Sequence, residues 1–143
     1  MSNDADSRLA PFKPWLRAAA IYNLVWGTTV ILSPLLFFNL LDISSPGALP
    51  FWRVVGMFVL VYAPGYWWAA RNPAAHGHLV LIGTLGKVLG PIGFVWAFVS
   101  GALPLRFGLV LVTNDLIWWP SFALYLREVA RLHGGWSRFL RGD

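Results

Sequence analysis

The chain has 143 residues, of which 57% are hydrophobic and only 12% are charged, and its mean hydropathy is +0.61. Soluble domains usually carry about a quarter charged residues, so this composition indicates a protein whose surface is largely solvated by lipid. A net charge of +5 would suggest a nucleic-acid partner for a soluble domain, but here the basic residues flank apolar runs, and no nucleic-acid partner is expected. Because cysteine is absent, disulfides, thiolate metal sites and cysteine nucleophiles are excluded.

Residues 1 to about 14 are predicted to form a short polar tail, since Pro11 and Pro14 disfavour a helix before Trp15. The acidic start differs from the basic start of a signal peptide, and the first apolar run is longer than a signal-peptide core. This run is therefore expected to remain as a membrane-spanning helix from about residue 15 to residue 40, with Pro34 bending its far half.

Three more apolar runs follow, and turn-forming residues between 42 and 50 separate the first of them from the initial span. The later connections are short, so neighbouring helices should run antiparallel. The last helix should continue past the membrane over 126–133 and stop at Gly134 and Gly135, and the aromatic and basic tail 136–141 suits the lipid headgroup zone. Residues 127–143 together are expected to form a basic cytoplasmic helix and tail. The sequence thus predicts a single all-α domain, 1–143, an integral membrane four-helix up-down bundle with spans at about 15–40, 51–70, 79–99 and 107–126.

The basic residues are divided unevenly between the two ends of these spans. One side of the predicted bundle holds eight Lys and Arg residues, and the other holds only Arg53 and Arg106. Cytoplasmic segments of membrane proteins carry the excess of Lys and Arg, so we expect both termini in the cytoplasm. The eight residues are Arg8, Lys13, Arg17, Arg71, Arg127, Arg131, Arg138 and Arg141.

Polar side chains from all four predicted spans fall at similar depths in the membrane. At about 1.5 Å per residue, Asn23 and Lys87 lie roughly 12 Å from the cytoplasmic side. In a hydrocarbon core of about 30 Å, Tyr62 lies about 13 Å and Asp115 about 18 Å from that side. The offset of roughly 6 Å between Lys87 and Asp115 is within reach of a lysine side chain, so we expect the two charges to pair.

Three prolines each remove a helical hydrogen bond near this polar layer, because a proline cannot donate to the carbonyl four residues earlier. A freed carbonyl is tolerated in a membrane only where protein or water satisfies it. The carbonyls predicted to be freed are those of Lys87 (by Pro91), Leu116 (by Pro120) and Leu60 (by Pro64).

The Lys87–Asp115 pair has two interpretations. Ionisable residues within a membrane usually serve a function, which makes both residues candidates for catalysis or ligand binding. Alternatively, the pair locks the helices together; for Asn23 this interpretation, a bond between helices, is preferred. For Tyr62 and Tyr66 function and packing are equally supported. The glycines at 83, 86, 90 and 93 form a stripe of small residues that close helix packing explains best.

The remaining signals are weaker. His76 and His78 alternate in a loop without a nearby carboxylate, so no metal site is predicted. Trp118 and Trp119 follow Asp115 on the same helix face, where they either wall an aromatic pocket or anchor in lipid. The sequence contains no phosphate loop, nucleophile elbow or dinucleotide fingerprint, and no cofactor can be named from it.

Four segments of the chain, 22–27, 55–57, 86–94 (Gly-Lys-Val-Leu-Gly-Pro-Ile-Gly-Phe) and 113–119 (Thr-Asn-Asp-Leu-Ile-Trp-Trp), resemble a family of short bacterial four-span membrane proteins. The function of that family is uncharacterised, and some members carry an alkyl hydroperoxide reductase label that this cysteine-free chain does not fit. The overall plan is also similar to DoxX-like membrane subunits, which accompany quinone-linked oxidoreductases. The resemblance implies a multi-pass protein of the bacterial cytoplasmic (inner) membrane.

Three functions are compatible with these features. The first is a binding or accessory protein that holds a lipid-like, quinone-like or small anionic ligand, alone or with a partner subunit or a second copy. The second is an intramembrane enzyme in which Asp115 and Lys87 form an acid–base pair on an apolar substrate. The third is an oligomeric transporter that uses the pair as a proton or ion relay. The predicted ligand-binding residues are Asn23, Tyr62, Lys87, Asn114, Asp115 and Trp119.

Overall fold

The computed structural model describes residues 2–45, 47 and 49–142, and every regular element within this range is helical. The predicted all-α class is therefore confirmed. In chain order the elements are α1 (Ser2–Leu9), η1 (Ala10–Phe12), α2 (Lys13–Leu32), α3 (Leu36–Leu40), α4 (Leu49–Arg71), α5 (Gly77–Val99), η2 (Leu105–Phe107), α6 (Gly108–Asn114), η3 (Leu116–Trp118), α7 (Trp119–Leu132) and α8 (Trp136–Arg141), where η marks a 3₁₀-helix.

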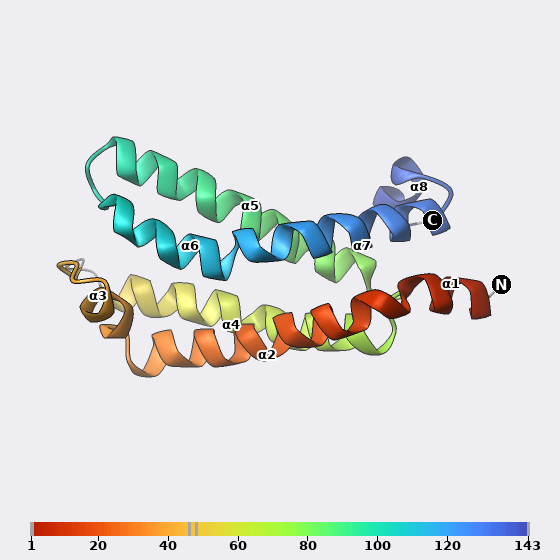
Figure 1. Cartoon of the computed structure of the whole chain (residues 1–143), viewed down its shortest axis with the longest axis horizontal. Helices are drawn as coiled ribbons and strands as arrows, with labels where there is room; N and C mark the ends of the chain where they lie inside the picture. Colours follow the sequence, from red (N-terminus) through yellow and green to blue (C-terminus); the bar gives the residue numbers. More distant parts are fainter. Residues whose placement is uncertain (1, 46, 48, 143) are drawn as a thin grey trace.

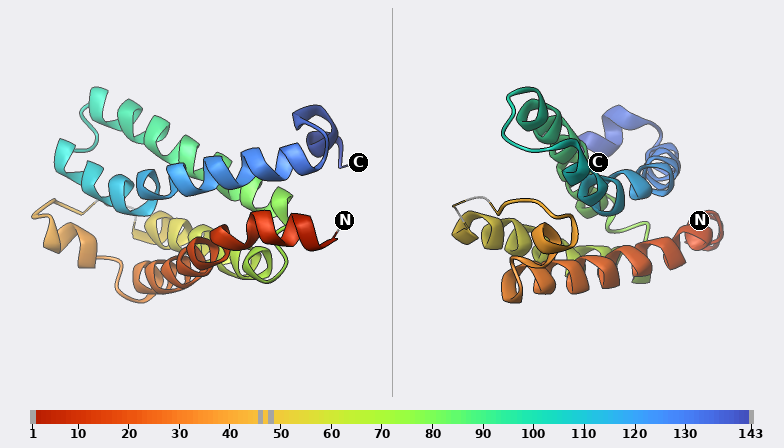
Figure 2. Two further views of the ribbon diagram at one scale, coloured as in Figure 1. Left: turned by 45° about the vertical axis from the view of Figure 1, so that its right-hand side comes forward. Right: turned by 60° about the vertical axis from the view of Figure 1, so that its left-hand side comes forward.

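The long helices form two layers (Figure 1). α2 and α4 lie side by side in one layer, whereas α5 and the segment from α6 to α7 form the other (Figure 2). Both chain ends lie at the same end of the molecule as the α4–α5 connection. One cluster of buried side chains, around Tyr66 and Tyr125, joins the layers near the termini, and a second, around Trp26 and Phe38, joins them at the far end.

The α2–α4 layer depends on two glycines. A methyl group on Gly27 would lie 2.7 Å from the carbonyl oxygen of Gly56, and a methyl group on Gly56 would lie 2.9 Å from Cβ of Val30. Small residues allow helix backbones to approach closely, which is the main source of packing energy between helices in lipid. These two positions therefore fix the close contact between α2 and α4.

The prediction of a polar tail before Trp15 is wrong, because the chain is already helical from Ser2. Pro11 and Pro14 occupy the first turns of η1 and α2, where a missing backbone N–H leaves no helical bond unmade. The N-terminal helix is held by tertiary contacts. Leu9 is fully buried, and Arg8 pairs with Glu128 of α7 at 3.2 Å.

The first predicted span is shorter than expected. α2 ends at Leu32, because Ser33 (φ −129°, ψ 64°) leaves the helical region, which is disfavoured for the residue before a proline. After Pro34 the chain turns and forms the short helix α3. The predicted loop over 42–50 includes residues 46 and 48, which lie outside the described residues, and α4 already begins at Leu49.

Three segments of the described chain are long and apolar enough to cross a membrane: Leu49–Arg71, Gly77–Val99 and Leu105–Leu132. α2, with 20 residues, is not among them, although it packs along α4. The structure thus supports a membrane protein, while the fourth crossing and the location of the termini stay predictions.

The last long segment is not one continuous helix. α6 ends at Asn114, Asp115 has non-helical backbone angles (φ −120°, ψ −60°), and the chain passes through η3 before α7 begins at Trp119. Pro120 lies in the first turn of α7, where it is tolerated for the same reason as Pro14. The break places Asp115 at the centre of the bundle.

Candidate functional site: a cavity between the two helix layers

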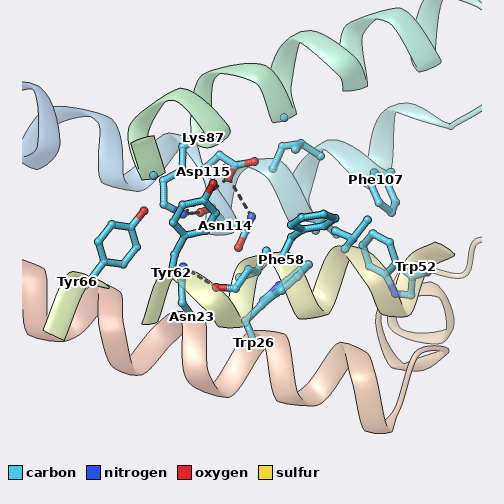
Figure 3. Close-up of a pocket in the computed structure, with 17 residues that line it drawn as sticks. Asn23, Trp26, Trp52, Phe58, Tyr62, Tyr66, Lys87, Phe107, Asn114 and Asp115 are labelled. Carbon is cyan, nitrogen blue, oxygen red and sulfur yellow. Dashed lines mark hydrogen bonds and ion pairs between the residues drawn. The ribbon is translucent and has the colours of Figure 1, made fainter. Parts of the chain in front are cut away.

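A cavity of about 300 Å³ lies between the two layers, in the space between the two buried clusters (Figure 3). α2, α4, α5 and α6 all contribute to its wall. The volume is at the lower end of the range typical of small-molecule sites, about 300–1,000 Å³. Most of its lining is apolar or aromatic, and the polar residues are Asn23, Tyr62, Tyr66, Lys87, Asn114 and Asp115, besides the indoles of Trp26 and Trp52.

Lys87 projects from α5 into the bundle and is only 4% exposed. Its Nζ donates a hydrogen bond of 2.5 Å to the backbone carbonyl oxygen of Asn114 and lies 3.8 Å from Oδ1 of Asp115. In a continuous α-helix, the Trp118 N–H would donate to the Asn114 carbonyl. Here the Trp118 N–H donates to the Asp115 carbonyl instead, so the Asn114 carbonyl is available to Lys87. The helix break therefore supplies both the carboxylate and the carbonyl that meet the lysine.

Asp115 is held from two further directions. Its Oδ1 accepts a 2.9 Å hydrogen bond from Nδ2 of Asn114. Its other oxygen, Oδ2, lies close to α5, where a methyl group on Gly90 would be 2.7 Å away. Glycine at this position of α5 thus makes room for the carboxylate. The sequence had suggested packing between helices as the role of this glycine.

Asn23 of α2 and Tyr66 of α4 also line the cavity. Nδ2 of Asn23 donates a 3.1 Å hydrogen bond to the carbonyl oxygen of Val59, which is the bond between helices expected of this residue. The Tyr66 hydroxyl lies against the backbone of α5 at Gly83, where an added methyl group would overlap it. Both side chains are 1% exposed.

Several buried polar atoms around the cavity lack a hydrogen-bond partner among the described residues. Native structures contain only a few such atoms per hundred residues, so a cluster of them calls for an explanation. The unpaired atoms belonging to cavity residues are Asn23 Oδ1, Trp26 Nε1, Trp52 Nε1, Tyr66 Oη and Asn114 Oδ1.

Aromatic rings form the end of the cavity farther from the termini. Trp52 contacts both Trp26 and Phe107, with ring centres 5.8 Å and 5.7 Å apart (Figure 3). Trp26 follows Asn23 by three residues, so the two share a helix face, and this spacing could have identified Trp26 from the sequence. Trp52 and Phe107 lie near the starts of their segments, and no sequence pattern connects them to the polar layer.

The carbonyl that Pro91 frees on α5 is satisfied by a neighbouring helix. Nε1 of Trp119 donates a 3.1 Å hydrogen bond to the carbonyl oxygen of Lys87. This arrangement is the one predicted for a proline-interrupted helix within a membrane.

The structure brings five of the six predicted site residues to the cavity: Asn23, Tyr62, Lys87, Asn114 and Asp115. Trp119 is not in the cavity lining, and its indole serves the backbone of α5 instead. Trp118 is also absent from the lining and packs against Tyr22 and Phe122 in the core. The tryptophans that line the cavity are Trp26 and Trp52 instead of the two that the sequence suggested.

Outside the cavity, His78 has a structural contact. Its Nε2 lies 2.6 Å from the carbonyl oxygen of Phe139, and its ring stacks on the Phe139 ring. Because a carbonyl only accepts, Nε2 carries a proton in this contact. His78 therefore attaches α8 to the start of α5.

Protein-family models, curated proteins and solved structures were compared with the chain, and none of them matches it. The resemblance to bacterial four-span proteins therefore stays a prediction.

Proposed function

We propose that this chain is a multi-pass membrane protein that binds a small, mainly apolar molecule in the cavity, with the polar part of the molecule near Lys87 and Asp115. The observation that carries the proposal is the set of buried, unpaired polar atoms around an otherwise apolar space. A buried polar atom without a partner costs about 1–3 kcal/mol, and a bound molecule with suitable donors and acceptors removes this cost. Ligand sites typically combine apolar walls with a few convergent polar groups.

The proposed setting is the bacterial inner membrane, with four crossings and both termini in the cytoplasm. Support for the orientation comes from charge, since the eight basic residues counted above belong to the end of the bundle that carries the termini and the α4–α5 connection. Support for the fourth crossing comes from α2, which runs beside α4 within one layer.

An acid–base role for Lys87 and Asp115 is less well supported than binding. The two side chains contact each other, and each also has a hydrogen bond with Asn114. Lys87 donates to the backbone carbonyl of Asn114, and Asp115 accepts from its side-chain amide. These contacts hold both groups in place, which suits recognition of a polar group. They also tie α5 to the break in the last segment, as the locking interpretation requires.

A matched pair of variants tests the binding proposal. Val110 is 6% exposed and lines the cavity, whereas Val112, on the same helix, is 43% exposed and does not line it. We expect wild-type protein extracted in mild detergent to carry a bound small molecule, detectable by native mass spectrometry. Val110→Phe should fill the cavity and lose this molecule, and Val112→Phe should retain it. Equal occupancy in Val110→Phe and wild type would contradict the proposal.

A further inference from the structure

The charges that face the cavity cancel. Among the described residues that line it, the charged ones are Lys87 and Asp115, one of each sign, with 3.8 Å between Nζ and Oδ1. An anionic head group would have to share the ammonium with the carboxylate and would lie next to a like charge. Burying a charge without a partner of opposite sign is strongly unfavourable in a low-dielectric site.

The unpaired atoms also select for a neutral partner. The indole nitrogens of Trp26 and Trp52 are donors, the amide oxygens of Asn23 and Asn114 are acceptors, and the Tyr66 hydroxyl is both. An anion can only accept, so it would leave the two amide oxygens unpaired. A hydroxyl group donates and accepts, and so satisfies atoms of both kinds.

The exposed part of the cavity lining lies on α4 and α5. Val55 and Phe58 of α4 are 42% and 67% exposed, and Gly86 of α5 is exposed as well. The lining residues from α2 and α6 are buried or half-buried. Because α4 and α5 are both long and apolar enough to span a membrane, the mouth between them faces lipid.

α4 and α5 separate with distance from the loop that joins them, as Figure 1 shows. Near the loop, a methyl group on Gly83 would overlap the Tyr66 hydroxyl. At Gly86 the corresponding distance to the Tyr62 hydroxyl is already 3.9 Å, and at Gly93 nothing lies within 4 Å. Gly86 therefore sits where the gap opens, and its lack of a side chain keeps the mouth clear.

We infer that the cavity takes an uncharged, lipid-soluble molecule with a hydroxyl-bearing head, and that the molecule enters from the bilayer between α4 and α5. This inference rests on the proposed function and adds the charge class of the ligand and its route. The cavity volume of about 300 Å³ equals that of about ten water molecules in the liquid, so a probe of about ten non-hydrogen atoms is suitable.

The test compares 1-nonanol with nonanoate at pH 8, two probes with the same chain length and different head charge. Binding is measured as the rise in unfolding temperature of the purified full chain in one detergent. We expect nonanol to act on wild type at a concentration about tenfold lower than nonanoate does. Asp115→Asn keeps an oxygen that can accept from Asn114 and leaves Lys87 without its counter-charge. Relative to wild type, it should shift the ratio of the two apparent affinities toward nonanoate by about tenfold or more. Partitioning of each probe into the micelle is the same for both proteins, so it cancels in this shift.

The route is tested with two substitutions on one helix. Gly86→Trp places an indole at the mouth and should weaken nonanol binding about tenfold or more, whereas Gly93→Trp, in open space, should leave it unchanged. If nonanoate binds wild type as tightly as nonanol does, and Val110→Phe abolishes this binding, the inference about charge is overturned and the proposed function stands. If Gly86→Trp binds nonanol as tightly as the wild-type protein does, the inference about the route is overturned. Failure of both probes to bind wild type would overturn the inference and the proposed function together.

Discussion

At the scale of single residues, two buried tyrosines of the same core cluster differ in how their hydroxyl groups are paired. In the core near the termini, the Tyr125 hydroxyl donates a 2.6 Å hydrogen bond to the carbonyl oxygen of Pro73. Tyr66, which is equally buried, has a hydroxyl with no partner among the described residues. The two tyrosines have the same side chain and burial, so the difference between them isolates the hydrogen bond.

This difference makes a prediction for the ligand-free protein. Tyr125→Phe should lower the free energy of unfolding by about 1–2 kcal/mol, because it leaves the Pro73 carbonyl unpaired. Tyr66→Phe should cost nothing or stabilise the protein slightly, since it removes a buried unpaired hydroxyl. Equilibrium unfolding in detergent measures both values. A larger loss for Tyr66→Phe than for Tyr125→Phe would show that the Tyr66 hydroxyl already has a partner.

At the scale of helices, prolines decide where backbone groups become available to other segments. Pro91 lies inside α5 and removes the N–H that would bond the carbonyl of Lys87. Trp119, at the start of α7, supplies the missing donor. Pro91 and Trp119 therefore form one unit that joins α5 to the last segment beside the Lys87–Asp115 pair.

A double-mutant cycle tests this unit. Trp119→Phe should destabilise the protein by about 1–3 kcal/mol, because the Lys87 carbonyl loses its partner. In a Pro91→Ala background the N–H of residue 91 can bond this carbonyl, so the same substitution should cost about 1 kcal/mol less. Trp96→Phe, at a position that is 80% exposed, is the control and should change stability by less than about 0.5 kcal/mol. An equal cost of Trp119→Phe in both backgrounds would contradict the coupling.

At the scale of the whole molecule, the topology depends on α2. Its neighbour α4 is a candidate membrane span, and the two helices pack together through Gly27 and Gly56. If α2 crosses the membrane beside α4, Ser7 and Ser137 lie on one side and Ser45 lies on the other. All three serines are exposed.

The absence of cysteine makes this arrangement directly measurable. In intact bacterial cells, a membrane-impermeant maleimide should label Ser45→Cys and leave Ser7→Cys and Ser137→Cys unlabelled until the membrane is opened. The positive-inside distribution of Lys and Arg is the physical reason for this orientation. Labelling of Ser7→Cys from outside, with Ser137→Cys protected, would show that α2 does not cross the membrane.

Much of the fold could be predicted from the sequence because the apolar runs and the turn-forming residues between them are local signals. The depth argument also worked for Lys87 and Asp115, since the rise of a helix converts residue numbers into depth and only two charges fall within the last two apolar runs. Helicity before Trp15 was missed because it depends on burial of Leu9 against α7, a contact between distant parts of the chain.

The cavity itself could not be predicted from the sequence. Trp52 and Phe107 meet across 55 residues of chain, and no periodicity within either helix points to the other. The position of Trp119 outside the cavity lining could not be predicted either, because the backbone angles at Asp115 set the direction in which the later side chains of the segment point.

By itself, the sequence determined the all-α class, the approximate limits of α4 and α5, and the pairing of one charge of each sign between the last two apolar runs. These properties follow from composition and from the fixed rise of a helix, which need no knowledge of neighbours. Only the tertiary structure decided that the helices pair as two layers, that Gly90 makes room for Asp115, and that a space with unpaired polar atoms remains between the layers. A cavity is the volume that packed side chains leave unfilled, so it exists only once all the helices are in place.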